Sequence, residues 1–297
     1  MPPKKRGQSM QVIFHLGAHC TDGGLLIRSI LRNRAALAAE GIGVPGPGRY
    51  RELIGEVSTT LRGSAADTDT EDMLLEAIRD DDTAVRVVLS NENFLCRVGV
   101  VLAQNGLYPK AEKSSWLRQC LPSHEVEFAL AIRNPATFVP EALAAAGEGH
   151  GILEGLSLGD LMWSEVIADI AAANPGARIV AWCHEDTPFI WSEVMREVTG
   201  HDPFTRLEGG FDMLDTIMSE DGMTRLTDFL AEREIENETK RRRAIAAFLE
   251  AHALRDEIET EIDLPGWTED TVAALTELYE EDVARIARMQ GVTFISP

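Results

Sequence analysis

One segment near the N-terminus, residues 11–34, constrains the fold more than any other part of the sequence. It reads QVIFHLGAHCTDGGLLIRSILRNR. The run 12–16 is apolar and rich in β-branched and aromatic side chains, which predicts a buried strand. A loop with three glycines, residues 17–24, follows the strand. Leucines and isoleucines then recur at helical spacing and predict a helix over residues 23–39.

A strand, a glycine-bearing turn and a helix in this order leave backbone N–H groups unpaired at the helix N-terminus, where an anion can bind. The loop GAHCTDGG contains no Lys or Arg, and Asp22 gives it a negative charge. Two like charges about 4 Å apart repel by roughly 1–4 kcal/mol, which offsets the ~0.3–2 kcal/mol gained at a helix end. Asp22 can instead cap the helix. Capping and anion binding compete for the same N–H groups, and we favour the cap.

The same segment resembles the start of the PAPS-dependent sulfotransferases. Bacterial members of that family commonly read HIGTHKTGTT, followed by an amphipathic helix that ends in Asn-Arg. HLGAHCTDGG aligns with the motif without a gap, and Asn33-Arg34 lies at the same distance. Cys20 stands where the family has the lysine that binds the 5′-phosphosulfate. His15, Gly17, His19 and Thr21 match, while Asp22, Gly23 and Gly24 replace Gly-Thr-Thr. The resemblance implies PAPS as cofactor, bound by Gly17, Ala18, His19, Cys20, Thr21, Asp22, Gly23 and Gly24.

A second point of resemblance follows the predicted strand 126–132, which ends in Arg133-Asn134-Pro135. A guanidinium at a strand end can hold a phosphate through two hydrogen bonds. In the family, a strand ending in Arg-Asp/Asn-Pro supplies an arginine that grips the 3′-phosphate of PAPS, together with a serine eight residues later. Here the arginine is Arg133 and the residue eight positions on is Glu141. The resemblance therefore implies that Arg133 contacts the 3′-phosphate, and that Glu141 stands in place of the serine that makes the second contact. Without the family, Arg133 reads as a salt-bridged structural residue.

Candidate catalytic residues lie at the ends of the predicted strands. Strand 85–89 runs into Ser90-Asn91-Glu92-Asn93, and the carboxyl ends of strands in open α/β sheets face the ligand crevice. Glu92 could take a proton from an acceptor hydroxyl, and the family often has Ser-x-Glu here. His19 is the second candidate base. Glu92 could equally order the turn or cap the next helix, so both readings stay open.

Metal binding is not predicted. A fourth strand, 177–183, precedes His184-Glu185-Asp186, whose side chains cannot all reach one metal from an extended chain. His19, Asp22, Glu92 and His184 would converge only if the strand order brought their strand ends together. The sequence has no HxxxH and no cysteine pair at metal-binding spacing.

Four strand–helix units in series predict an α/β protein with a central, mainly parallel sheet between two layers of helices. The resemblance makes this a three-layer α/β/α sulfotransferase fold of the P-loop NTPase type. Residues 1–10 are expected to be a disordered leader, 11–200 the core, and 201–297 a mostly helical extension packed on it. Helices are predicted within 223–253 and over 268–290. The glycine-rich segment 147–159 is a candidate lid or acceptor loop.

Charge and composition restrict the partners. The 297 residues carry a formal net charge of −21, with a pI near 4.7, which weighs against nucleic acid. The basic run 240–243 lies among glutamates and predicts a solvated helix face with i,i+4 pairs. No apolar run reaches the ~18 residues that span a bilayer, and no secretory signal is evident. Four scattered cysteines predict reduced thiols and a cytoplasmic location.

Three functions remain open from the sequence. The leading interpretation is transfer of a sulfonate group from PAPS to a hydroxyl or amine of a small-molecule or glycan acceptor. The alternative is a sulfotransferase-fold binding or assembly protein, without activity or PAPS binding and with a protein partner. It rests on the replacements at Cys20, Asp22 and Glu141. The third retains an anionic ligand of another kind, such as a nucleotide sugar or a phosphorylated metabolite.

Overall fold

The computed structural model describes residues 9–79, 83–103, 106–147, 156–233, 237–258, 262 and 264–297. Within them, six strands form one sheet in the order β2-β3-β1-β6-β7-β8, and every neighbouring pair is parallel. Their bounds are β1 Gln11–His15, β2 Ile42–Gly43, β3 Arg86–Ser90, β6 Glu125–Ile132, β7 Ile179–Cys183 and β8 Val292–Ile295. The predicted mainly parallel sheet is confirmed.

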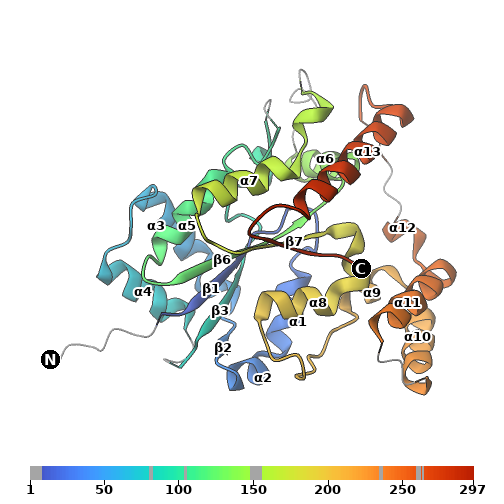
Figure 1. The fold of residues 1–297 in the computed structure, drawn as a ribbon, viewed down its shortest axis with the longest axis horizontal. Coiled ribbons are helices and arrows are strands. Elements are labelled where there is room, and N and C mark those ends of the chain that lie inside the picture. Colours follow the sequence, from blue (N-terminus) through green and yellow to red (C-terminus); the bar gives the residue numbers. More distant parts are fainter. Residues whose placement is uncertain are drawn as a thin grey trace.

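Helices cover both faces of the sheet, which confirms the three-layer α/β/α architecture (Figure 1). Side chains alternate along β1, so Phe14 packs in one core layer and Ile13 in the other. The Ile13 layer lies under α1 (Leu25–Arg32), α2 (Arg34–Ala39), α8 (Thr187–Thr199) and α9 (Asp212–Ile217). The Phe14 layer lies under α3 (Arg51–Leu61), α4 (Thr68–Ile78), α5 (Ser114–Cys120), α6 (Pro135–Ala146), α7 (Trp163–Ala173) and α13 (Glu269–Ile286). Both faces of β1 are therefore buried.

The predicted helix over residues 23–39 is wrong in one respect, because the chain forms two helices that meet at Asn33. The Asn33 side-chain amide donates to the carbonyls of Ser29 and Glu208, each at 2.9 Å, and its Oδ1 accepts from the Glu208 N–H at 2.8 Å. Asn33 thus ends α1 and fixes the segment that follows α8. The helical spacing of apolar residues continues across Asn33, so the break between the two helices could not be predicted from this pattern.

Four short strands were not predicted. β2 lies inside the expected turn-rich connection 41–48 and pairs with β3. β4 (Leu102–Ala103) and β5 (Gly106–Leu107) form a separate antiparallel pair. β8 follows α13 and pairs with β7, so the last residues of the chain complete the sheet. Strands of two to four residues carry too little periodicity to be detected.

The C-terminal helices α10 (Glu220–Glu232), α11 (Glu238–His252) and α12 (Arg255–Ile258) lie to one side of the sheet (Figure 1). The predicted helical character of residues 223–253 is confirmed. The prediction of a solvated basic face on residues 240–243 is wrong for two of the four. Arg241 donates to Ser192, and Arg242 pairs with Glu193 at 2.9 Å, so both anchor α11 on α8.

Two expectations fall on segments that are only partly described. Residues 148–155 of the candidate lid and residues 1–8 of the expected leader lie outside the described residues. No helix in the described part of the chain is long and apolar enough to cross a membrane.

Phe14 tests the position of β1 in the core. Its ring is fully buried, with centroids 5.2 Å from Phe94 and 6.2 Å from Phe128. We expect Phe14→Ala to lower the free energy of unfolding by about 3–5 kcal/mol in urea denaturation. Met73→Ala, at a side chain 44% exposed, should stay within about 0.5 kcal/mol. Equal effects of the two substitutions would contradict the placement of β1.

Candidate functional site

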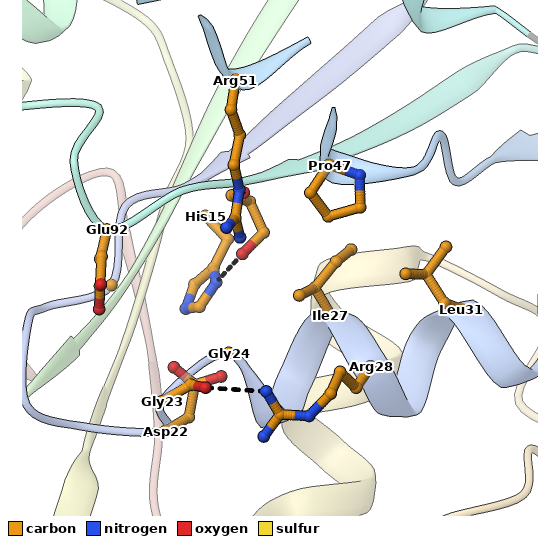
Figure 2. A pocket seen from close by; sticks show the side chains of 12 residues that line it. His15, Asp22, Gly23, Gly24, Ile27, Arg28, Leu31, Pro47, Arg51 and Glu92 are labelled. Carbon is orange, nitrogen blue, oxygen red and sulfur yellow. Dashed lines mark hydrogen bonds between the residues drawn. The ribbon is translucent and has the colours of Figure 1, made fainter. Parts of the chain in front are cut away.

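A cavity of about 340 Å³ opens at the carboxyl ends of β1 and β3 (Figure 2). The loop after β1, the start of α1 and the start of α3 form its other walls. It lies where ligands bind in open α/β sheets. The lining residues are His15, Gly17, Asp22, Gly23, Gly24, Ile27, Arg28, Leu31, Pro47, Arg51, Ser90 and Glu92.

His15 is the last residue of β1 and lies directly opposite Ser90 in the register of β1 and β3. Its Nδ1 lies 2.9 Å from the Ser90 Oγ, and its ring stacks on Trp182 at 5.9 Å between centroids. Burial lowers the pKa of His15, as does the Arg51 charge, while Asp22 and Glu92 raise it. The net shift is downward, so the imidazole is neutral near pH 7 and can accept a proton.

The backbone of Ser90 is fixed by two neighbouring residues at the start of α3. The Tyr50 hydroxyl accepts from the Ser90 N–H at 2.8 Å and donates to the Ser90 carbonyl at 3.0 Å. The Arg51 Nε donates to the same carbonyl at 2.9 Å. Within the described chain, the Arg51 side chain also hydrogen-bonds to the Tyr50 hydroxyl, and no carboxylate pairs with it. The guanidinium points into the cavity beside His15 (Figure 2).

Asp22, a residue of the loop 17–24, hydrogen-bonds to the first N–H groups of α1. The Asp22 Oδ2 accepts from the Leu26 N–H at 2.7 Å, and the Asp22 carbonyl accepts from the Leu25 N–H at 2.8 Å. Asp22 therefore performs the capping role, although Gly24 occupies the formal N-cap position. The N–H groups of Gly23 and Gly24 have no acceptor within the described part of the chain, and both residues line the cavity.

His19, a predicted base and loop ligand, does not line this cavity. It is 3% exposed, and its Nδ1 and backbone N–H lie 2.9 and 3.0 Å from the Tyr108 hydroxyl. Its Nε2 lies 3.3 Å from the Asn93 Oδ1. Both ring nitrogens thus have partners that anchor the loop. Thr21 also bonds within the loop, donating to the Ala18 carbonyl at 2.6 Å, and the Ala18 N–H donates to Ala131 at 3.1 Å.

Arg133 lies outside the cavity and is fully engaged by protein groups. Both terminal nitrogens donate to the Glu141 carboxylate, one of them also donates to the Cys20 carbonyl, and the Nε donates to Thr137 at 3.1 Å. The residue is 7% exposed. The Glu141 carboxylate thus binds the Arg133 guanidinium, which the resemblance assigns to the 3′-phosphate of PAPS. Burial, followed by the Glu141 charge, raises the pKa of the nearby Cys20 thiol to about 11.

Glu92 lines the cavity and is exposed, and it has no hydrogen-bond partner among the described residues. It packs against the loop at Gly17, whose φ of +99° is a conformation that L side chains rarely adopt. A Cβ on Gly17 would lie 3.3 Å from the Glu92 Cβ, so a side chain there would crowd the site.

A second, much smaller cavity shares His15 and Asp22 with the first. His184 also lines this second cavity, so the strand order brings His184 near Asp22, whereas His19 lines neither cavity. Glu185 is used elsewhere, accepting from the Asn134 N–H at 2.7 Å and the Tyr279 hydroxyl at 2.9 Å. No group of three or more His, Cys, Asp or Glu side chains among the described residues is placed to hold a metal ion.

The structure also adds two cavity residues that sequence reasoning missed, Arg28 and Arg51. Arg28 lies on α1 and donates to the Gly23 carbonyl at 2.9 Å. Arg51 follows the turn-rich connection after α2. Neither occurs in a recognisable motif, and only the packing of α3 beside the end of β3 brings Arg51 to the site.

Comparison with known proteins adds no assignment. No protein-family model matches the chain, and no curated protein matches its sequence. The sulfotransferase resemblance therefore rests on the two motifs alone and stays a prediction.

The cap at Asp22 can be measured. Asp22→Ala should lower the free energy of unfolding by about 0.5–2 kcal/mol in urea denaturation, because it removes the acceptor for the Leu26 N–H. Asp22→Asn keeps a side-chain oxygen that can accept from the Leu26 N–H, so its free energy of unfolding should fall much less. Equal losses in the two variants would show that the charge, and not the hydrogen bond, matters.

The buried histidines predict a pH dependence of stability. Burial lowers the pKa of His15, His19 and His124 from the usual value of 6.5. Below about pH 6.5 the unfolded chain therefore binds more protons than the folded one, so the stability that these groups contribute is lost as the pH falls. We expect a lower urea midpoint at pH 6.0 than at pH 7.5, and a smaller difference in His19→Gln. A midpoint that rises on acidification would contradict this.

Proposed function

We propose that the protein binds a small anionic ligand in the cavity at the ends of β1 and β3 and does not use PAPS as a donor. One observation carries the proposal. Arg51 is held by the Ser90 carbonyl and the Tyr50 hydroxyl, and its guanidinium faces the cavity without a carboxylate partner among the described residues. A guanidinium fixed in this way loses little conformational entropy when it binds a carboxylate or phosphate.

Two of the residues expected to hold PAPS, Asp22 and Glu141, count against an ordinary nucleotide site. The Glu141 carboxylate occupies the same donors of Arg133 that a 3′-phosphate would need. Asp22 occupies an N–H at the start of α1 and adds a negative charge. A bound nucleotide would have to displace one carboxylate and tolerate another. This supports the interpretation of a sulfotransferase-like protein that has lost PAPS binding.

The cavity favours a small ligand with one anionic end. About 340 Å³ lies at the lower limit of small-molecule sites. Arg28 supplies a second cation, whereas Asp22 and Glu92 would repel a heavily charged ligand. Ile27, Leu31 and Pro47 provide apolar contact. We therefore expect a carboxylated or singly phosphorylated metabolite. Four free cysteines support a reducing compartment such as the cytoplasm for this function.

Sulfonate transfer from PAPS to a hydroxyl or amine acceptor is the second candidate. It is supported by the Gly23 and Gly24 N–H groups, which have no acceptor in the described chain, and by Glu92, which lines the cavity as a potential base. In this alternative, Arg133 would exchange Glu141 for the 3′-phosphate when the nucleotide binds.

Calorimetry separates the two candidates. We expect inorganic phosphate to bind the wild-type protein and Arg51→Met to weaken binding roughly 10- to 150-fold, the loss of one or two charge-assisted hydrogen bonds worth ~1.5–3 kcal/mol. Arg133→Met should bind phosphate as the wild type does, since Arg133 does not line the cavity.

Adenosine 3′,5′-bisphosphate, the desulfonated form of PAPS, is the second probe. We expect no heat attributable to Arg133, so Arg133→Met and the wild type should behave alike. Nucleotide binding that Arg133→Met abolishes and Arg51→Met retains would overturn the proposal in favour of the transferase.

A further inference from the structure

The hydroxyl of Ser90 and the imidazole of His15 form a hydrogen-bonded pair on the wall of the cavity. The Oγ lies 2.9 Å from Nδ1, and both residues line the cavity although their exposed fractions are only 5% and 2%. The register of β1 and β3 sets these residues side by side, so the contact is built into the sheet.

One direction of this hydrogen bond satisfies both groups. Within the described chain, His15 Nδ1 is the one hydrogen-bond partner of the Ser90 Oγ. A ring proton on Nδ1 would leave the Ser90 hydroxyl proton without a protein acceptor, which is costly for a buried group. We therefore assign the hydroxyl as the donor to Nδ1, with the proton of the neutral ring on Nε2. A serine donating to an imidazole nitrogen is the arrangement that activates a serine nucleophile.

A carboxylate completes the arrangement. Asp22 lines the same two cavities as His15, and its charge is the strongest influence, after burial, on the pKa of His15. One of its oxygens accepts from Leu26, and the other has no partner in the described chain. An anion at this position stabilises the imidazolium that forms when the ring takes a proton. The His15 ring stacks on the Trp182 ring, and this contact restricts its orientation.

We propose that Ser90 and His15 are a nucleophile and its base, and that the cavity hydrolyses small carboxylic esters bearing an anionic group. The anionic group rests on the proposed function, because Arg51 and Arg28 would bind it. The nucleophile and base rest only on the Ser90–His15 geometry.

The reaction balances with water as the one further reactant. Ser90 Oγ attacks the ester carbonyl carbon and passes its proton to His15 Nδ1. The bond to the alcohol oxygen breaks, and the alcohol takes the proton from Nδ1. A water molecule then attacks the acyl-serine, giving a proton to Nδ1 and its oxygen to the carbonyl carbon. The acyl–Oγ bond breaks, the proton returns to Ser90, and an acid and an alcohol leave.

A fluorophosphonate probe tests the nucleophile without needing the anion site, because it modifies activated serines directly. We expect intact mass to show one adduct on the full-length protein and peptide mapping to place it on Ser90. Ser90→Ala should abolish labelling. His15→Gln should slow it roughly 10²- to 10⁴-fold, the usual contribution of a general base. The matched control is Ser114→Ala, a buried serine that bonds to Asn174 at 2.8 Å and has no imidazole partner. It should label as the wild type does.

If His15→Gln does not fold, Ser90→Cys tests the same pair without changing His15. The thiol of this variant should react with iodoacetamide at least tenfold faster than Cys96 in the same protein. Cys96 serves as reference because burial raises its pKa to about 11. Slow alkylation of Ser90→Cys, or wild-type labelling that Ser90→Ala does not remove, would overturn the proposal.

The outcomes for the two proposals can be told apart. Phosphate binding without a Ser90 adduct would refute the nucleophile and leave the anion site standing. A Ser90 adduct without phosphate binding would refute the anion site and leave an esterase of neutral substrates, with p-nitrophenyl acetate as the assay.

Discussion

The parallel register between β1 and β3 is the constraint on which the rest of the site depends. It sets His15 opposite Ser90 at the carboxyl edge of the sheet, where the next residues must turn away from the strands. Both strands are buried on both faces, so a slip by one residue would exchange their two core layers. The core therefore fixes the contact between the two polar side chains. Tyr50 and Arg51 add hydrogen bonds to the backbone of Ser90 and tie α3 to the same point.

Carboxylates occupy the places where an anionic ligand was expected. Asp22 accepts from an N–H at the start of α1, and Glu141 accepts from both terminal nitrogens of Arg133. These contacts keep a strand–turn–helix loop ordered without a lysine in it. Intramolecular hydrogen bonds therefore already stabilise the ordered loop. An anionic ligand that replaced Asp22 at the Leu26 N–H, or Glu141 at Arg133, would gain little net binding free energy. Arg51 differs because it lines the cavity and no carboxylate in the described chain pairs with its guanidinium.

The fold could be predicted from the sequence because the strands that matter are apolar and each is followed by a helix of regular period. The 126–132 strand shows this, since all its residues are apolar except Glu127. The site could be predicted only in part. Asp22 was favoured as a cap because of its place before a helix, which is a local property. His15 was recognised only as a motif match, and its contact with Ser90, 75 positions away, depends on strand order. Arg51 needed the packing of α3, for which no sequence signal exists.

The two sides of β1 differ in how the strand ends are covered, and this limits the size of the ligand. On the β6–β7 side, α13 closes the edge: Tyr279 donates to Glu185, Glu185 accepts from the Asn134 N–H, and the Asn134 side chain donates to Thr276 at 3.0 Å. On the β3 side, the open cavity begins directly at His15 and Ser90. A dinucleotide-sized ligand spanning the strand ends would have to break the α13 contacts as well as the Arg133–Glu141 pair. A small ligand on the β3 side breaks neither, so the geometry favours chemistry confined to the space between α1, α3 and the ends of β1 and β3.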